Sequence, residues 1–247
     1  MSFDRVHFEL SHYCNLGCKF CYAAFAKQGM STEAAKKIIK WIKQKGTKLL
    51  VFGGGDPLLR KDLAELLEYC KELSQPVAID TNGLLLNEEF LEIIKDKVIR
   101  IGIPLDGACE ATQYKIRGKK GLFKKSMQNI KKLSKYGIPF KVNTMVCKHN
   151  LNEISKIGHL IEKYVPSRWS VHQFCPVERG NLHKELFEIS NKEYYALQAK
   201  IIHEFPQLNI KFPCQETSNG TYNIISPEGV MYTVRNGKNF QLPNLIN

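Results

Sequence analysis

Three cysteines, Cys14, Cys18 and Cys21, stand close together near the start of the sequence in the spacing C-x3-C-x2-C. The other five of the eight cysteines are spread singly along the chain. Thiolate is the usual ligand of iron–sulfur clusters, and three thiolates on one tight loop can hold three irons of a [4Fe-4S] cube. The fourth iron is then open to another ligand. A zinc site closed by His12 is the alternative, since structural zinc takes four ligands.

A second segment that could take part in chemistry is the glycine-rich stretch Gly53-Gly54-Gly55-Asp56-Pro57. Glycine has no side chain, so a ligand or another segment can approach its backbone closely. The same residue types also form ordinary turns between a strand and a helix. Both the cysteines and the glycines follow a predicted strand, which places them where such folds carry their sites.

The elements that must position these residues follow from apolar periodicity, which predicts short strands alternating with longer amphipathic helices. The predicted strands are 6–10, 48–52, 77–80, 99–104, 140–146 and 169–174, and the predicted helices are 32–44, 61–73, 88–95, 122–135 and 151–164. Helices between successive strands require parallel pairing with right-handed crossovers. We therefore predict an α/β fold, a partial (β/α)6 TIM-like barrel with its active residues at the C-terminal ends of the strands.

The pattern changes after this alternation. A helix is expected from Ser190 to about His203, followed by a break at Pro206. Two apolar runs, 222–225 and 230–234, flank the turn Ser226-Pro227-Glu228-Gly229 and predict a β-hairpin. We expect residues 1–187 to form the barrel core, with residues 188–247 as a C-terminal helix and β-hairpin extension packed on the barrel.

The cysteine spacing, with the aromatic Phe20 directly before the last cysteine, resembles the radical S-adenosylmethionine (radical SAM) superfamily, and the resemblance covers roughly residues 6–174. It implies one [4Fe-4S] cluster on the three cysteines, with S-adenosyl-L-methionine chelating the open iron. Reductive cleavage would give a 5′-deoxyadenosyl radical that abstracts a substrate hydrogen. The resemblance also implies an electron donor such as flavodoxin or ferredoxin. The protein would aim the radical and exclude water.

The same resemblance implies roles in cofactor binding. Gly53, Gly54 and Gly55 would receive the methionine amino group through their carbonyls, and the family usually has Glu where Asp56 stands. Phe20 would stack near the adenine, and Arg117 would pair with the cofactor carboxylate, which suits a planar bidentate donor. Further cofactor-binding candidates lie in or just after strands: Thr81, Asn82, Asp106, Asn143 and Gln173. Each of these polar residues could instead cap a helix or a turn.

The second half of the chain resembles the viperin type of this superfamily, enzymes that abstract a ribose hydrogen from a nucleoside triphosphate and dehydrate the nucleotide. The resemblance rests on the segments 140–143, 168–173, 178–181 and 221–225. It implies that Asn143 and Arg168 touch nucleotide. Tyr222 would be the catalytic hydrogen donor that reduces the product radical.

An anionic substrate needs cationic side chains to bind it. The viperin pattern has a phosphate-binding lysine two residues after Arg168, where this chain has Ser170. Polyphosphate needs several cationic donors, and Lys27 and Lys141 are candidates beside Arg168. The order of the motifs does not show which lysines point inward.

Composition and charge further limit the functions that the protein can have. The chain has 247 residues and a net charge of +12, which favours an anionic partner. Lysine runs such as Lys36-Lys37 are also typical of solvated helix faces. No apolar run reaches the ~18 residues of a membrane span, and the N-terminus lacks the apolar core of a signal peptide. We expect a cytoplasmic enzyme with a small anionic substrate, no membrane role and no nucleic-acid partner.

Two alternatives stay open. One is a radical SAM maturase that modifies a peptide or protein, with Cys175, Cys214 and the cationic surface as docking features. The other is a non-enzymatic zinc or iron–sulfur binding module. Auxiliary iron–sulfur clusters are not expected, because Cys175 and Cys214 are too few and too far apart in sequence.

Overall fold

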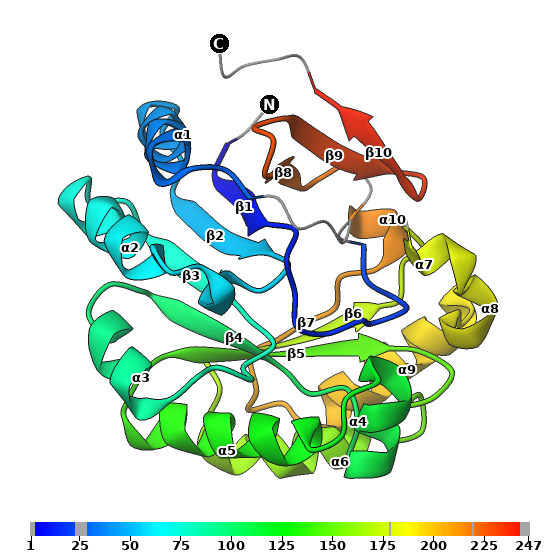
Figure 1. Ribbon diagram of the computed structural model, residues 1–247. Helices are drawn as coiled ribbons and strands as arrows, with labels where there is room; N and C mark the ends of the chain where they lie inside the picture. Colours follow the sequence, from blue (N-terminus) through cyan, green and yellow to red (C-terminus); the bar gives the residue numbers. More distant parts are fainter. Residues whose placement is uncertain (1–2, 23–28, 178, 219, 243–247) are drawn as a thin grey trace.

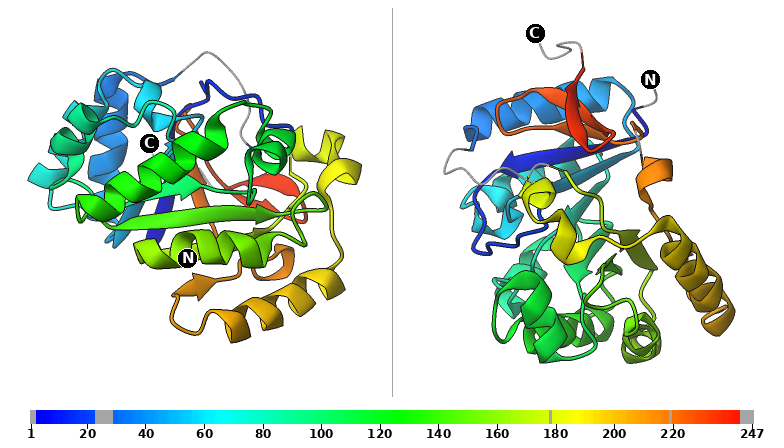
Figure 2. Two further views of the ribbon diagram at one scale, coloured as in Figure 1. Left: turned by 90° about the horizontal axis from the view of Figure 1, so that it is seen from below. Right: turned by 90° about the vertical axis from the view of Figure 1, so that its right-hand side faces the viewer.

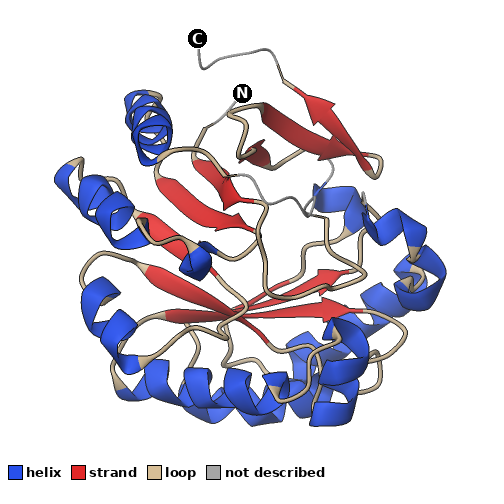
Figure 3. Ribbon diagram, in the orientation of Figure 1, coloured by secondary structure: helices blue, strands red, loops and turns tan. Residues whose placement is uncertain are grey.

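The computed structural model describes residues 3–22, 29–177, 179–218 and 220–242. A single ten-stranded sheet runs through it in the order β10-β9-β8-β1-β2-β3-β4-β5-β6-β7 (Figures 1 and 3). Its strands are β1 Arg5–Ser11, β2 Leu49–Gly54, β3 Val77–Asp80, β4 Arg100–Pro104, β5 Phe140–Val146, β6 Arg168–Gln173, β7 Ile210–Lys211, β8 Asn223–Ile225, β9 Met231–Arg235 and β10 Lys238–Gln241. Neighbours from β8 through β1 to β7 pair in parallel, and β9 and β10 pair antiparallel.

Helices cover the outer face of the curved sheet (Figures 1 and 2). They are α1 Thr32–Gln44, α2 Leu63–Glu72, α3 Glu88–Ile94, α4 Glu110–Arg117, α5 Leu122–Lys135, α6 Ile154–Ile161, α7 Arg179–Leu182, α8 Lys184–Phe187, α9 Asn191–Glu204 and α10 Gln215–Ser218, with 3-10 turns η1 Pro57–Leu59 and η2 Glu162–Tyr164. Local sequence sets several of their starts. Ser190 and Glu193 form a reciprocal capping box at α9, and Ser31 caps α1.

The sheet curls into an open barrel, so the predicted α/β partial barrel is confirmed. The predicted hairpin is present as β8 and β9, joined by the turn at Ser226–Gly229. Its first strand also pairs in parallel with β1 and so extends the sheet. The short helix α4 and the strands β7 and β10 were not predicted, because each is short or weakly patterned.

Alternate residues of the barrel strands face opposite sides, and this alternation separates core from cavity. On β1, Val6, Phe8 and Leu10 are fully buried in the main hydrophobic core. On β6, Trp169 and Val171 belong to the same core. The residues between them are polar and face the inside of the barrel, so the concave face of the sheet is free to carry a site. No helix in the described part of the chain is long and apolar enough to cross a membrane.

Candidate active site

A cavity of about 1220 Å³ occupies the inside of the open barrel. At one end it is lined by Cys14, Cys18 and Cys21, beyond the C-terminal ends of the strands. At the other end it reaches Arg5 and Arg168, the first residues of β1 and β6. The cysteines and the strand starts therefore share one continuous space.

The cysteine loop packs into an apolar shell of its own. Cys18 is buried beside Leu16 and Leu122, with Cys14 and Cys21 packed against this cluster. Burial raises the pKa values of the Cys14 and Cys18 thiols. Metal binding to such thiols displaces their protons, so these residues are suited to a metal ligand rather than to a free thiolate.

The donor set fits an iron–sulfur cube better than a single zinc ion. Within the described residues, no three His, Cys, Asp or Glu side chains converge on one point that could hold a metal ion. Each cysteine of a cube binds a different iron, so the thiols around it need not converge. The Nε2 of His12, the alternative zinc ligand, is engaged with Glu228, whose Oε1 lies 2.9 Å away, and its Nδ1 is buried without a hydrogen-bond partner.

The glycine-rich stretch holds the segment before the cysteine loop in place through backbone hydrogen bonds. The Gly55 N–H donates to the Ser11 carbonyl at 2.6 Å, and the Asp56 N–H donates to the Tyr13 carbonyl at 2.9 Å. A Cβ on Gly55 would overlap the Tyr13 carbonyl, and a Cβ on Gly54 would lie 2.5 Å from the Ser11 carbonyl oxygen. Gly54 also has φ +102°, a conformation that favours glycine. Gly54 and Gly55 line the cavity, whereas Gly53 is not part of its lining.

Asp56 lies behind the cavity wall and organises it. Its carboxylate accepts hydrogen bonds from Thr81 Oγ1 at 2.9 Å and from the Asn82 N–H at 2.8 Å. It also accepts from the Leu58 N–H and so caps η1. Thr81 and Asn82 themselves line the cavity, and Asn82 Nδ2 donates to Asn15 Oδ1 at 2.7 Å. Asp56 therefore acts on the cavity through the residues that follow β3.

Arg117 and Asp106 meet beside the cysteine loop. The Arg117 Nε donates to the fully buried Asp106 carboxylate, which also accepts from the Met145 N–H at 2.7 Å. The Arg117 guanidinium lies 5.1 Å from the Phe20 ring centroid, and the Cys18 thiol lies 3.7 Å from the Arg117 carbonyl oxygen. Burial opposes the charge on Arg117, but Asp106 outweighs it and raises the arginine pKa. Arg117 and Phe20 line the cavity, and Asp106 holds Arg117 from outside its lining.

Asn143 and Gln173 both line the cavity but differ in whether their side-chain polar atoms are free to bind a ligand. The Asn143 Oδ1 is buried without a hydrogen-bond partner, so it can accept from a ligand. The Gln173 Nε2 donates to Asn191 Oδ1 at 2.8 Å, and its Oε1 accepts from the Gln215 N–H at 3.1 Å. Gln173 is thus occupied in holding the first residues of α9 and α10.

The deep half of the cavity is cationic. Its basic lining comes from four strands: Arg5, His7, Lys141, Arg168, His172 and Lys211. Lys141 Nζ lies 2.9 Å from Asp80 Oδ1 in a buried ion pair. Burial favours the neutral imidazoles and lowers the pKa of His7 to about 3 and of His172 to about 4.

The sequence predicted Lys141 and Arg168 as members of this basic group. It did not predict Arg5 and Lys211, nor the Asp80 carboxylate that pairs with Lys141. Lys211 lies next to Ser170 in the β6–β7 register, so a neighbouring strand supplies a lysine beside the position where the viperin pattern has one. A sequence signal for such residues does exist. A strand with a buried-strand pattern that carries a polar residue at every second position has these polar residues on the inner face of a barrel.

Tyr222 lines the same cavity and lies directly before β8. Its ring is in edge contact with His7, with 5.4 Å between the ring centroids. Lys27, the remaining predicted substrate ligand, lies outside the described residues.

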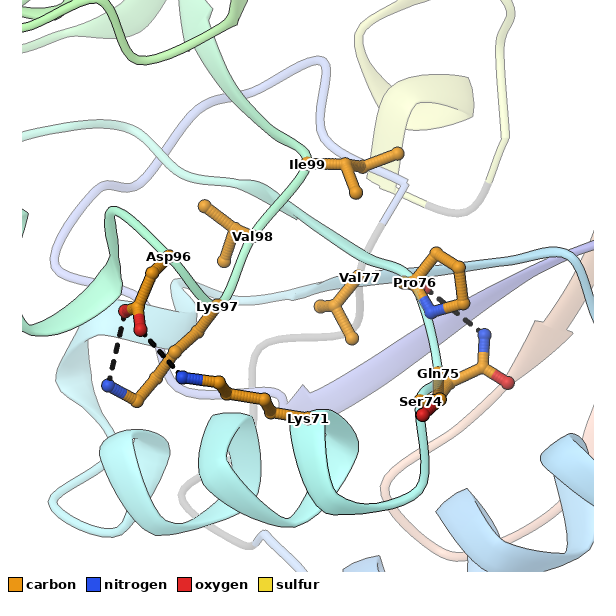
Figure 4. A pocket seen from close by; sticks show the side chains of 9 residues that line it. All are labelled: Lys71, Ser74, Gln75, Pro76, Val77, Asp96, Lys97, Val98 and Ile99. Atoms are coloured by element: carbon orange, nitrogen blue, oxygen red, sulfur yellow. Dashed lines mark hydrogen bonds and ion pairs between the residues drawn. The ribbon is translucent and has the colours of Figure 1, made fainter.

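A second, smaller hollow of about 260 Å³ lies near the start of β3 and β4 (Figure 4). Its two lysines share one carboxylate, because Asp96 lies 2.6 Å from Lys71 Nζ and 3.4 Å from Lys97 Nζ. Figure 4 shows both lysines directed at Asp96. Lys97 Nζ also lies 3.4 Å from Glu68 Oε2, so each lysine of this hollow has a carboxylate partner.

Comparisons with known proteins place this geometry among relatives. The family model described as the radical SAM superfamily matches residues 8–161. An AdoMet-dependent heme synthase of Methanosarcina barkeri is 32% identical over 208 residues, which cover 82% of this chain and 58% of the relative. An S-adenosylmethionine-dependent nucleotide dehydratase of Lacinutrix mariniflava is 31% identical over 239 residues, covering 91% of this chain and 49% of the relative.

Solved structures show the same fold. SuiB of Streptococcus suis bound to S-adenosylmethionine superposes with a TM-score of 0.76 at 19% sequence identity, covering 85% of this chain and 50% of SuiB. SuiB bound to the precursor peptide SuiA gives a TM-score of 0.75 over 85% of this chain and 48% of SuiB. The chain thus spans about half the length of these relatives.

Proposed function

This chain belongs to the radical SAM superfamily, and on that premise we propose that it abstracts a hydrogen atom from an anionic small molecule, with a nucleoside triphosphate as the substrate class. Members of this superfamily use a [4Fe-4S] cluster and S-adenosylmethionine. When bound, the two groups supply the one-electron chemistry that removes the substrate hydrogen. We propose Cys14, Cys18 and Cys21 as the cluster ligands.

The observation that carries the substrate proposal is the continuity of the cavity. It joins the cysteine loop to a group of basic residues that includes Arg5, Arg168 and Lys211. Cations that line an enclosed space attract anions and hold them more strongly than surface charges do. A nucleoside triphosphate carries its negative charges at one end and an uncharged sugar and base at the other, so its phosphates can meet the basic residues while its sugar lies toward the cysteine loop.

The residues near the cysteines would hold the cofactor. Gly54, Gly55, Thr81 and Asn82 supply backbone and side-chain polar groups around the loop, and Arg117 is a cation next to it. Asp56 and Asp106 support these groups from behind. The unpaired oxygen of Asn143 lies farther along the cavity wall, where it can accept a hydrogen bond from a sugar hydroxyl.

Tyr222 is proposed as the donor that returns a hydrogen to the product radical. It lines the cavity and contacts His7, so its phenol is inside the barrel and held by packing. In Tyr222→Phe, the nucleotide should still stimulate 5′-deoxyadenosine formation, while the reduced product should be lost. The matched control is Tyr136→Phe, at an exposed tyrosine on the helix side of the barrel.

The test of the whole proposal is a turnover assay on the full chain, reconstituted with iron and sulfide under anaerobic conditions and reduced. We expect at least one nucleoside triphosphate to raise 5′-deoxyadenosine formation well above the substrate-free background. The nucleotide dehydratase among the relatives supports this choice of substrates. A flat response to every nucleoside triphosphate would contradict the substrate proposal.

A peptide is the second candidate substrate, and one structural feature favours it. Strand β10 is one edge of the sheet, with its four residues exposed, and its first residue Lys238 and the preceding Gly237 line the cavity. An exposed edge strand can pair with an extended peptide and lead it toward a site. The structure of SuiB with the peptide SuiA supports keeping this candidate. Stimulation of 5′-deoxyadenosine by a peptide but by no nucleotide would select it.

A further inference from the structure

Three arginines stand at the end of the barrel opposite the cysteine loop. Arg5, Arg100 and Arg168 are the first residues of β1, β4 and β6, at the ends opposite the strand arrowheads in Figure 1. All three are partly buried; Arg5 and Arg168 line the cavity, and Arg100 is not among its lining residues. The Nε atoms of all three, and Nη2 of Arg100, are buried without a hydrogen-bond acceptor in the described structure.

Unpaired buried donors are costly. A buried donor without a partner costs about 1–3 kcal/mol, and more when the group carries a charge. Native proteins therefore satisfy nearly all such groups with protein, water or a ligand. Three arginines with the same deficiency at one end of one barrel indicate a ligand that accepts hydrogen bonds and carries negative charge.

The surrounding protein does not provide that negative charge. Asp80 is the carboxylate that acts on Arg100, and it already forms a buried ion pair with Lys141 at 2.9 Å. Burial lowers the pKa of Arg100, and Arg168 and Arg5 lower it further, whereas Asp80 opposes them. The charges of Arg5 and Arg168 thus act on Arg100.

We propose that Arg5, Arg100 and Arg168 form an anion subsite that binds the phosphate groups of a di- or triphosphate. This inference rests on the proposed function in that the phosphates belong to a substrate whose other end reaches the cysteine loop. Arg5 and Arg100 are the new elements of the site, since neither belongs to the motifs that indicated a nucleotide.

Charge favours a di- or triphosphate over a single carboxylate. With Lys141 and Asp80 neutralising each other, the three arginines leave about three positive charges to be compensated. A di- or triphosphate carries a comparable negative charge, whereas a single carboxylate would leave two guanidinium groups unpaired. The guanidinium fork matches two oxygens of a phosphate and of a carboxylate alike, so the discrimination comes from charge.

The binding test uses inorganic tripolyphosphate as the probe and the full chain as the protein. Isothermal titration should show saturable binding that weakens about tenfold or more in Arg5→Gln and in Arg100→Gln, as expected for the loss of a charge-assisted hydrogen bond. The double variant should lose more than either single one. The control is Lys131→Gln on the exposed face of α5, which removes a positive charge outside the barrel and should bind as the wild type does.

A thermal scan separates binding from a merely structural role. Since the arginines are unpaired, neither Arg5→Gln nor Arg100→Gln should melt below the wild type without ligand, and both should lose the stabilisation that tripolyphosphate gives to the wild type. Variants that melt lower but bind the probe unchanged would overturn the proposal. Citrate is the carboxylate probe, and tighter binding of citrate than of tripolyphosphate would overturn the assignment to phosphate.

The two proposals can fail separately. If tripolyphosphate binds through Arg5 and Arg100 but no nucleotide stimulates 5′-deoxyadenosine, the anion subsite holds and the proposed function fails. If a nucleotide stimulates the wild type and Arg5→Gln/Arg100→Gln with the same KM, the proposed function holds and the subsite fails.

Discussion

Asp80 on β3 and Lys141 on β5 form an ion pair across β4, with 2.9 Å between Oδ1 and Nζ. They meet because Gly102 on the intervening strand has no side chain, and a Cβ there would overlap the Asp80 carboxylate. Burial opposes the charge on Asp80, but Lys141 outweighs it and lowers the Asp80 pKa to about 2. One glycine thus determines which charges of the barrel interior are neutralised.

Replacing Asp80 with Asn should destabilise the protein and strengthen anion binding. The change leaves Lys141 buried and unpaired, which typically costs about 3–5 kcal/mol. Urea unfolding should show this loss, and titration with tripolyphosphate should show tighter binding than in the wild type. The control is Asp96→Asn, whose ion pairs are exposed and contribute about 0–1 kcal/mol. Unchanged stability in Asp80→Asn would show that the ion pair is not formed in solution.

Acid should destabilise the fold through the buried histidines. In the unfolded chain His7 and His172 have pKa values near 6.5, whereas burial lowers them to about 3 and about 4 in the folded protein. The unfolded state therefore binds more protons between these limits, so stability is fully present above about pH 6.5 and is lost as the pH falls.

The double substitution His7→Asn/His172→Asn should flatten this pH dependence between about pH 6 and pH 4. The urea midpoint, measured at a series of pH values, is the readout. His203→Asn, at an exposed histidine of α9, should keep the slope of the wild type. An equal slope in the double variant would mean that other groups cause the acid sensitivity.

Adding one methyl group at Gly55 should disrupt the cysteine loop. In Gly55→Ala the new Cβ overlaps the Tyr13 carbonyl, so the segment before Cys14 must move. We expect about 1–3 kcal/mol of destabilisation, as for other overpacked sites, together with a lower iron content after reconstitution. Gly53→Ala is the matched control, because nothing lies within 4 Å of its added Cβ. Equal iron content in the two variants would contradict the seating role of Gly55.

Loss of one cysteine should abolish the cluster. Cys14→Ala should bind far less iron and sulfide than the wild type and lose the visible charge-transfer absorption. S-adenosylmethionine cleavage should fall below detection. Cys109→Ala, at an exposed cysteine outside the cavity lining, should retain all three properties. A full iron and sulfide content in Cys14→Ala would exclude Cys14 as a ligand.

The cysteine end of the site was open to prediction because its information is local. Short stretches of sequence are enough to recognise the spacing from Cys14 to Cys21 and the order of the βα units. Asp56 was expected to serve the cofactor, but its part in positioning Thr81 and Asn82 depends on contacts between β2 and β3 that a motif does not show.

The cationic end was harder to predict because it depends on register. Arg5 and Arg100 lie at strand starts, where a charge normally indicates solvent, and their inward direction follows from pairing with distant strands. Lys211 comes from β7, which has two residues and no detectable strand pattern. The Asp80–Lys141 pair needs a glycine on a third strand, so no single segment contains it.

Strand β1 carries Arg5 at one end and leads directly into the cysteine loop at the other. Its length from Arg5 to Ser11 is about 20 Å at ~3.3 Å per residue, and the strand is clamped between β2 and β8. A molecule that engages the arginines can therefore meet a cofactor held beside the cysteine loop only if it spans the part of this length that the cofactor leaves free.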